Sequence, residues 1–286
     1  MHLVAQGTSS SAADAPSFRG PIAQTLCETH ADMNYQDREG NTPLHHAASL
    51  IEEDAGLLIS IFIDHGSRPS IPNIRGQTPL HLFCHNQAAR RHAFYHEALH
   101  LMLVNGADPN QVSLSGCTAI HLALFHQDVD AAVLLVRNGA QINQSWRKPK
   151  SWQATWTDMG TEDILPLDMV EDVAMLSRIL CEISNPQARA PKRIRCMHCK
   201  SKLGMFARTQ NCSHCGRSIC GRCCAGTLPA SFCPHIQNED GKGNMCRVCI
   251  LCKPIILSRV NNAGVPTTIM SSNNACDQSS IGTLSL

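Results

Sequence analysis

The sequence predicts a mainly α-helical protein, in which a solenoid of stacked repeats precedes a small zinc-stabilised finger. Three observations support this prediction. Aromatic residues make up only 4% of the 286 residues, which suits a helical or repeat architecture better than a β-sandwich. A short motif recurs at steps of 36 and 40 residues in the first half of the chain. Eight cysteines further along the chain fall into four Cys-x2-Cys pairs.

The repeated motif combines a turn glycine with a helix start. It stands at 40–45 (GNTPLH), 76–81 (GQTPLH) and, in weaker form, 116–121 (GCTAIH). Its threonine can cap a helix, and a proline fits the first helical position, where the missing N–H costs nothing. Each copy is followed by a helix-period apolar run that ends at Gly66, Gly106 or Gly139, where a left-handed residue is wanted. Each copy is therefore expected to form a tight turn and two helices.

This pattern resembles the ankyrin repeat, T-P-L-H-x-A followed by L-L-x-x-G-A-x-x-N. The resemblance covers residues 30–182, with three clear copies and a degenerate capping copy that begins LPLDM at 165–169. The steps exceed the family's 33 residues, so insertions are expected, the larger one reading NQAARRHAFYHEAL. The resemblance implies that the concave face of the stack binds a protein partner. It also implies that His45, His81 and His121 form hydrogen bonds between repeats and are neither metal ligands nor bases.

The four Cys-x2-Cys pairs predict two closed structural zinc sites. They are Cys196/Cys199, Cys212/Cys215, Cys220/Cys223 and Cys249/Cys252. A Cys-x2-Cys turn places two thiolates on one side of a tetrahedral metal, so two pairs complete one site. The alternative is a secreted disulfide framework. The first residues have neither a basic start nor a continuous apolar core, and no run of about 18 apolar residues could span a bilayer. We therefore expect a cytoplasmic protein with metal-bound cysteines.

The order C-x2-C-x12-C-x2-C-x4-C-x2-C, a loop of 25 residues and a last C-x2-C resembles the FYVE-type zinc finger over residues 191–256. The resemblance implies a small α+β finger with cross-braced ligands. One zinc would be held by Cys196, Cys199, Cys220 and Cys223, and the second by Cys212, Cys215, Cys249 and Cys252. Cys246, three residues before Cys249, could replace it as a ligand, and this alternative stays open. A RING finger fits less well, because five residues separate His214 from Cys220 where two are needed.

FYVE-type fingers recognise phosphatidylinositol 3-phosphate on endosomal membranes, and the resemblance implies the same partner here. Of the family's basic pocket, however, only Arg208 and Arg247 remain, and no Trp-x-x-Asp precedes Cys196. Because a phosphomonoester favours charged donors, the phosphoinositide affinity should be low. The run 189–222 nonetheless holds nine Lys/Arg and no acid. The predicted membrane contacts are Lys200, Lys202, Met205, Phe206, Arg208 and Arg247.

The sequence thus predicts a non-enzymatic adaptor with two zinc ions, a protein partner on the ankyrin repeats and an endosomal or other anionic membrane on the finger. The alternatives are a scaffold without lipid binding and a divergent RING-type ubiquitin ligase. We expect no nucleic-acid partner: Trp146, Trp152 and Trp156 should pack an insertion onto the last repeat, and His198 and His214 should be exposed spacers. The expected segments are a disordered tail (1–29), the repeats (30–182), a linker (183–190), the finger (191–256) and a second disordered tail (257–286).

Overall fold

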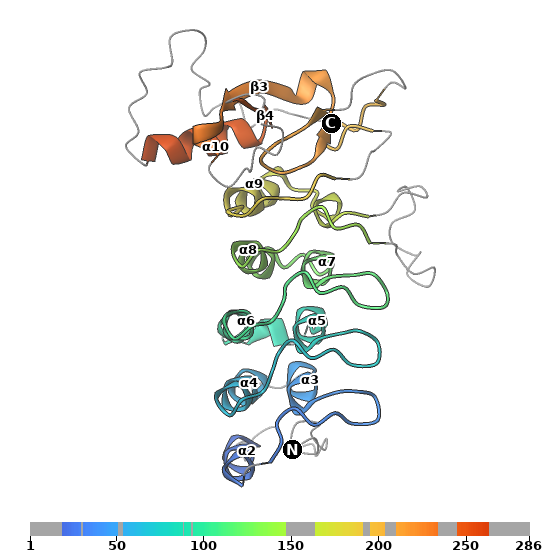
Figure 1. Ribbon diagram of the computed structural model, residues 1–286, viewed down its shortest axis with the longest axis vertical. Coiled ribbons are helices and arrows are strands. Elements are labelled where there is room, and N and C mark those ends of the chain that lie inside the picture. The colour runs from blue at the N-terminus through green and yellow to red at the C-terminus, as the bar shows by residue number, and fades with distance from the viewer. Residues whose placement is uncertain are drawn as a thin grey trace.

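The computed structural model describes residues 19–29, 31–50, 54–87, 89–92, 94–146, 164–190, 195–203, 210–233 and 245–262. These residues form an elongated stack of helices with a small finger at its C-terminal end (Figure 1). One column of the stack, the outer helices, contains α2 (Arg19–Glu28), α4 (Asp54–Asp64), α6 (Tyr95–Val104), α8 (Val129–Arg137) and α9 (Val173–Cys181). The inner column contains α3 (Pro43–Ala48), α5 (Pro79–His85), α7 (Ala119–Phe125) and the 3-10 turn η3 (Pro166–Met169).

Each inner helix starts on the predicted threonine, and the histidine three residues later completes the cap. The backbone N–H of Thr42 donates to Nδ1 of His45 at 3.0 Å, which leaves the ring proton on Nε2. Nε2 of His45 lies 3.0 Å from the carbonyl of Gln77 in the next repeat, and His81 makes the same contact to Cys117 at 3.3 Å. His45 and His81 are therefore inter-repeat hydrogen-bonding residues, as the sequence predicts.

The turn glycines let the loops between repeats lie edge to edge. Gly40 and Gly76 have φ values of +74° and +69°, which only glycine adopts readily. The backbone N–H of Ile74 donates to the carbonyl oxygen of Glu39 at 3.1 Å, and that of Leu114 donates to the carbonyl oxygen of Arg75 at 2.9 Å. A Cβ on Gly40 would come within 2.8 Å of the backbone nitrogen of Ile74, so close stacking also requires glycine.

The larger insertion contains the 3-10 turn η1 (Ala89–Arg91), and its last residues form the first turn of α6. Arg90 lies 3.1 Å from the carboxylate of Asp128, which is 6% exposed. Asp128 also caps α8 by accepting from the backbone N–H of Ala131 at 3.0 Å. One buried carboxylate thus anchors both the insertion and the next outer helix.

The last repeat is degenerate, since the 3-10 turn η3 stands where the other repeats have an inner helix. Asp168 takes the histidine's place, and its carboxylate accepts from the backbone N–H of Leu165 at 3.2 Å. Trp146 is 2% exposed, pairs with Ile164 in an isolated bridge and donates from Nε1 to Ser115 at 3.1 Å. Trp146 therefore packs onto the stack as expected, whereas Trp152 and Trp156 lie outside the described residues.

The finger is small and contains both short strands and a helix. Its strands are β1 (Gln210–Asn211), β2 (Ser218–Ile219), β3 (Cys224–Pro229) and β4 (Met245–Cys249), followed by α10 (Cys252–Asn262). Its 3-10 turns are η4 (Gly221–Cys223) and η5 (Ala230–Phe232). β1 pairs with β2 and β3 with β4, both antiparallel, with a bulge between Cys224 and Thr227. One apolar cluster runs from Ala23 in α2 to Ile256 in α10, so the stack and the finger share a continuous core.

The structure differs from the expected tails and linker. Helix α2 lies within 1–29 because Ala23 and Cys27 are buried against the stack. Helix α10 continues past residue 256 to Asn262, and Val260 on it is 8% exposed. Ala190, in the expected linker 183–190, is 5% exposed. Apolar positions in these polar-looking segments thus have burial partners that the local composition does not show. None of the described helices has the length and apolarity needed to cross a membrane.

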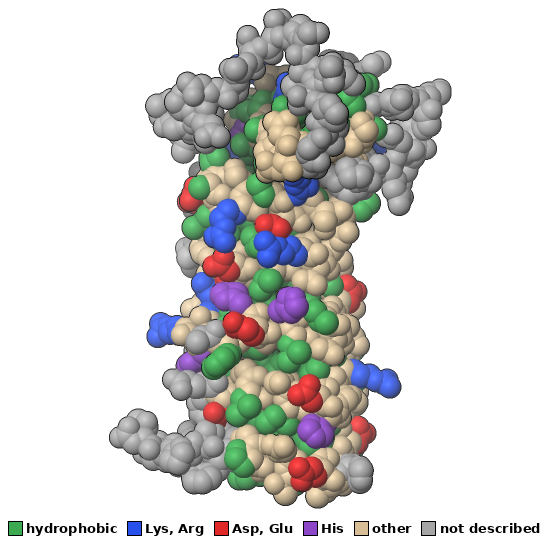
Figure 2. All heavy atoms as spheres, turned by 90° about the vertical axis from the view of Figure 1, so that its left-hand side faces the viewer, with side chains coloured by type: hydrophobic (Ala, Val, Ile, Leu, Met, Phe, Trp, Pro, Cys, Tyr) green, Lys and Arg blue, Asp and Glu red, His purple; other side chains and the backbone are tan. Residues whose placement is uncertain are grey.

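The outer helices present charged side chains where the stack meets the finger (Figure 2). Arg137 on α8 contacts Glu182 at 2.7 Å, and Arg178 on α9 contacts Asp130 at 2.5 Å. Both arginines are more than half exposed, so each pair contributes at most about 1 kcal/mol. These pairs align α9 on α8 but contribute little to its stability.

Candidate metal centres

Two Cys-x2-Cys turns form matching knuckles. In the first, the backbone N–H of Lys200 donates to the carbonyl oxygen of Cys196 at 3.0 Å, and in the second that of Gly216 donates to the carbonyl oxygen of Cys212 at 2.7 Å. Both donors have positive φ, 57° for Lys200 and 71° for Gly216. This conformation closes the turn and leaves the two thiols on the same side. Lys200 adopts it at a cost that glycine avoids.

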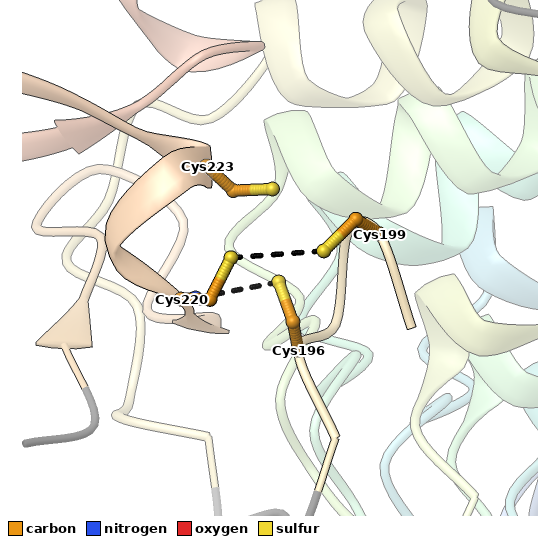
Figure 3. A group of neighbouring side chains, drawn as sticks. All are labelled: Cys196, Cys199, Cys220 and Cys223. Atoms are coloured by element: carbon orange, nitrogen blue, oxygen red, sulfur yellow. Dashed lines mark hydrogen bonds between the residues drawn. The ribbon is translucent and has the colours of Figure 1, made fainter. Parts of the chain in front are cut away.

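Centre one is defined as Cys196, Cys199, Cys220 and Cys223. The four side chains point toward one another (Figure 3), and their sulfur atoms all lie within 4.8 Å of each other. The Sγ atoms of Cys199 and Cys220 are 3.6 Å apart. A tetrahedral zinc with Zn–S bonds of about 2.3 Å needs S–S separations of about 3.8 Å. The backbone N–H groups of His198 and Cys220 each donate to Sγ of Cys196 at 3.4 Å, which stabilises a thiolate.

Centre two is defined as Cys212, Cys215, Cys249 and Cys252. Its four sulfur atoms also lie within 4.8 Å of one another, and all four residues are buried. The backbone N–H of Cys249 donates to Sγ of Cys212 at 3.3 Å. Strand β4 ends at Cys249 and α10 begins at Cys252, so this pair joins two elements. The structure therefore brings the eight cysteines together in the two sets that the FYVE resemblance implies.

The thiols of each centre cannot all ionise without a cation. In centre two, hydrogen bonds from Cys215, Cys249 and Cys252 lower the pKa of Cys212, whereas the facing Cys212 raises the pKa of Cys215. In centre one, hydrogen bonds from Ser201 lower the pKa of Cys199 to about 6. Like charges at this distance oppose each other, and a divalent cation removes that opposition for all four thiolates. The donor sets therefore fit zinc in both charge and geometry.

The remaining cysteines of the finger lie outside both centres. Cys246 lies on β4, where it is 2% exposed and pairs with Leu228. The cysteine of this strand that belongs to centre two is Cys249. Cys233 is fully buried, and burial raises its pKa to about 12. Burial also raises the pKa of Cys246. Both are thus poorly reactive thiols, and in this structure Cys246 does not replace Cys249.

Three of the predicted membrane contacts can be placed. Lys200 is 60% exposed, with Nζ 3.9 Å from the carboxylate of Asp168, and Lys202 is exposed on the same knuckle. Arg247 is exposed on β4, and its carbonyl accepts from the backbone N–H of Ser213 at 2.7 Å. Ser213 lies between the centre-two ligands Cys212 and Cys215, so Arg247 lies beside the second knuckle. Met205, Phe206 and Arg208 lie outside the described residues.

The prediction for His214 is wrong. His214 is fully buried, and its Nε2 lies 3.2 Å from the carbonyl of Leu180 in α9. It is buried because its knuckle faces the last repeat, a contact that the spacing of the cysteines does not show. His198 is half-buried, and burial lowers its pKa. Asn143 is a residue of this site that the sequence patterns did not indicate: it is 5% exposed and donates to the carbonyl of Cys215 at 2.7 Å.

Comparison with known proteins supports the repeats. The family described as "Ankyrin repeats (many copies)" matches residues 84–136. Neurogenic locus notch homolog protein 1 of Danio rerio is 40% identical over 124 residues, which are 43% of this chain and 5% of that protein. Rabankyrin-5 of Homo sapiens is 23% identical over 187 residues, 64% of this chain and 14% of that protein. Intracellular phospholipase A2 of Caenorhabditis elegans is 39% identical over 64 residues, 22% of this chain and 6% of that protein.

The helix pairs, the stacked turns and these matches agree on the class of protein. The chain contains ankyrin repeats, and such repeats serve protein–protein interaction. It also carries two four-cysteine groups that could each hold a metal ion. The chain spans only a small part of the length of the relatives it matches.

Proposed function

We propose that this chain is a zinc-dependent adaptor without catalytic activity. Its ankyrin repeats would bind a protein partner, and its FYVE-like finger would hold two zinc ions and attach to anionic membranes. The observation that supports the zinc assignment is the presence of two separate sets of four converging cysteine sulfurs. Four sulfur ligands saturate a tetrahedral zinc, so both sites would be structural.

The zinc assignment is tested by metal analysis of the full chain. Protein purified without chelator should contain two zinc ions per chain. Cys199→Ser and Cys252→Ser should each reduce this number to one, because the two cysteines belong to different centres. Serine at Cys246 should leave two zinc ions in place. A wild-type content below one zinc per chain, with no uptake from added zinc, would contradict the proposal.

The charge of the finger supports membrane attachment. The described residues from 195 to 262 include eight Lys/Arg and no Asp/Glu. Two Zn(Cys)4 centres would carry two negative charges each, so the net charge of this part would be about +4. Each basic residue near an anionic bilayer contributes about 1 kcal/mol. The exposed members are Arg195, Lys200, Lys202, Arg222 and Arg247.

Liposome sedimentation of the zinc-loaded full chain distinguishes the possible modes of attachment. Vesicles with phosphatidylserine, with or without phosphatidylinositol 3-phosphate, would be compared at two salt concentrations. Arg247→Ala tests the pocket residue that the structure describes, and Arg178→Ala, exposed on α9, is the matched control. Binding that falls with added salt, and that Arg247→Ala weakens while Arg178→Ala does not, would support the proposal. No binding to either vesicle would leave the finger as a protein-binding scaffold.

The stacked turns support a partner site on the ankyrin repeats. Ile74 and Leu114 occupy equivalent positions in successive repeats and are 63% and 80% exposed. Solenoids use such extended surfaces for recognition. Ile74→Ser and Leu114→Ser together should abolish binding of the physiological partner while leaving the thermal midpoint within about 2 °C, because exposed substitutions rarely change stability by more than about 0.5 kcal/mol.

A further inference from the structure

At two steps of the stack, an asparagine links one ankyrin repeat to the next through two hydrogen bonds. Asn34 donates from Nδ2 to the carbonyl of Gly66 at 3.0 Å, and its Oδ1 accepts from the N–H of Arg68 at 2.8 Å. Asn110 repeats this pattern with Gly139 and Gln141, at 2.9 and 2.7 Å. In both cases the amide binds the segment that follows the outer helix of the next repeat.

The last asparagine of this series binds the finger as well. Nδ2 of Asn143 donates at 2.7 Å to the carbonyl of Ala188 and, also at 2.7 Å, to the carbonyl of Cys215, a ligand of centre two. Gln141 holds the same segment, since its Nε2 donates to Pro186 at 3.1 Å and its Oε1 accepts from Ala188 at 2.8 Å. Residues 186–188 follow α9 and thus have the same place in the last repeat as residues 139–141 have after α8, and the second knuckle packs against them.

The second knuckle, residues 212–216, packs closely against residues 188–190. The N–H of Ala190 donates to the carbonyl of Gly216 at 3.0 Å. A Cβ on Gly216 would lie 2.4 Å from the carbonyl oxygen of Ala188 and 2.5 Å from Nδ2 of Asn143. The first knuckle also contacts the repeat, because Met197 forms a buried cluster with Leu165 and Ala190. Both knuckles therefore cover the end of the stack.

The finger also binds the C-terminal end of α9. The last carbonyls of a helix have no partner within the helix, and a positive charge is favourable there. Nε2 of His214 lies 3.2 Å from the carbonyl of Leu180. The guanidinium of Arg259 on α10 donates to the carbonyl of Ile183 at 3.1 Å and to the carbonyl of Cys181. Both residues come from the part of the finger that centre two holds together.

We infer that centre two is the C-terminal cap of the ankyrin stack, so that metal binding there and folding of the last repeat are thermodynamically coupled. The inference rests on the zinc-binding part of the proposed function. It adds that the finger is not an independent module, and that zinc controls how many repeats are folded. Coupling between binding and folding is reciprocal: if zinc stabilises α9, disruption of the contact with α9 must weaken zinc binding.

Hydrogen exchange of the full chain tests the first half of this coupling. Amides of α9 and of residues 186–190 would be compared in the zinc-loaded protein and after chelation. We expect exchange there to accelerate at least about tenfold on chelation, because a region that loses its contacts opens locally. The amides of α4, at the other end of the stack, should keep their rates. Unchanged protection of α9 in a protein shown to lose two zinc ions would overturn the inference while leaving the zinc assignment intact.

Zinc competition against a chromogenic chelator tests the second half with matched variants. Asn143→Ala removes the two hydrogen bonds to the finger and its linker, whereas Asn110→Ala removes the equivalent bonds inside the stack. Asn143→Ala should weaken binding of one of the two zinc ions by about 3- to 10-fold, the effect expected for one or two net hydrogen bonds. Asn110→Ala should not change it. Equal zinc affinities of the two variants would overturn the coupling, and failure of the wild type to bind zinc would overturn both this inference and the proposed function.

Discussion

The buried histidines predict that the ankyrin stack loses stability in mild acid. His45 is fully buried, and Nδ1 accepts from the backbone N–H of Thr42, so protonation at Nδ1 would break the cap. Burial lowers the pKa of His45 to about 4, and it lowers that of His121 to about 4 as well. Both residues stand at the same position of their repeats, at the start of an inner helix.

The sign and size of the effect follow from linkage. In the unfolded chain these histidines have a pKa of about 6.5, so above that value both states are neutral and the full stability is present. Stability is lost as the pH falls from about 6.5 toward 4, because only the unfolded state then binds protons. At pH 5 the loss is about 2 kcal/mol per histidine, or about 4 kcal/mol for the two. That is a large share of the 5 to 15 kcal/mol typical of a folded protein.

Urea denaturation between pH 5.0 and 7.5, with a variant that lacks only His45 for comparison, measures this effect. His45→Asn lowers stability at neutral pH but removes one titrating group. The difference in unfolding free energy between wild type and His45→Asn should therefore shrink by about 2 kcal/mol from pH 7.5 to pH 5.0. Taking this difference cancels contributions common to both proteins, including acid release of zinc. His65→Asn, exposed at the end of α4, is the control and should follow the wild-type curve. A difference between wild type and His45→Asn that stays constant across this range would refute the reasoning.

Three further predictions concern single sites. Gly216→Ala should destabilise the chain by about 1 to 3 kcal/mol more than Gly66→Ala, since both glycines have positive φ but only Gly216 has a carbonyl within 2.4 Å of the new Cβ; urea midpoints of the two variants compare them. A thiol reagent should release the zinc of centre one first, because Cys199 is exposed and centre two is buried; simultaneous release, followed with a chromogenic chelator, would contradict this. Asp128→Ala should cost about 1 to 3 kcal/mol through the lost α8 cap and the unpaired Arg90, whereas Asp130→Ala, at an exposed position, should shift the thermal midpoint little.

The features predicted well from sequence are those encoded within a few residues. A Thr-Pro-Leu-His start contains the cap, the first helical residue and the ring that bonds to the next repeat. A Cys-x2-Cys turn likewise contains two ligands and the turn that aligns them. Even the grouping of the four cysteine pairs follows from their spacing through the FYVE resemblance, and the structure brings together the same two sets.

The contacts between the stack and the finger could not be predicted in this way. Asn143 and Cys215 are 72 residues apart, and Arg259 and Ile183 are 76 apart, so no local pattern relates them. His214 lies between two ligands, a position at which a polar spacer is the ordinary expectation. One signal was available: Asn143 ends a G-A-x-x-N motif, and its equivalents Asn34 and Asn110 each bind a following repeat. Asn143 is followed by a degenerate repeat alone, and its amide also binds the carbonyl of Cys215 in the finger.

The degenerate last repeat explains why a cap is needed at this end. Its inner element is the short turn η3 where the other repeats have a helix, and α9 is only nine residues long. Helices of this length depend on tertiary contacts for their stability. About three repeats is the minimum for a stable stack, so loss of the fourth layer would bring the array close to that limit. If centre two caps this layer, zinc occupancy determines the length of the partner-binding surface. The finger and the repeats should therefore be studied as one body, and a finger excised near residue 190 would expose the buried His214 and Met197 to solvent.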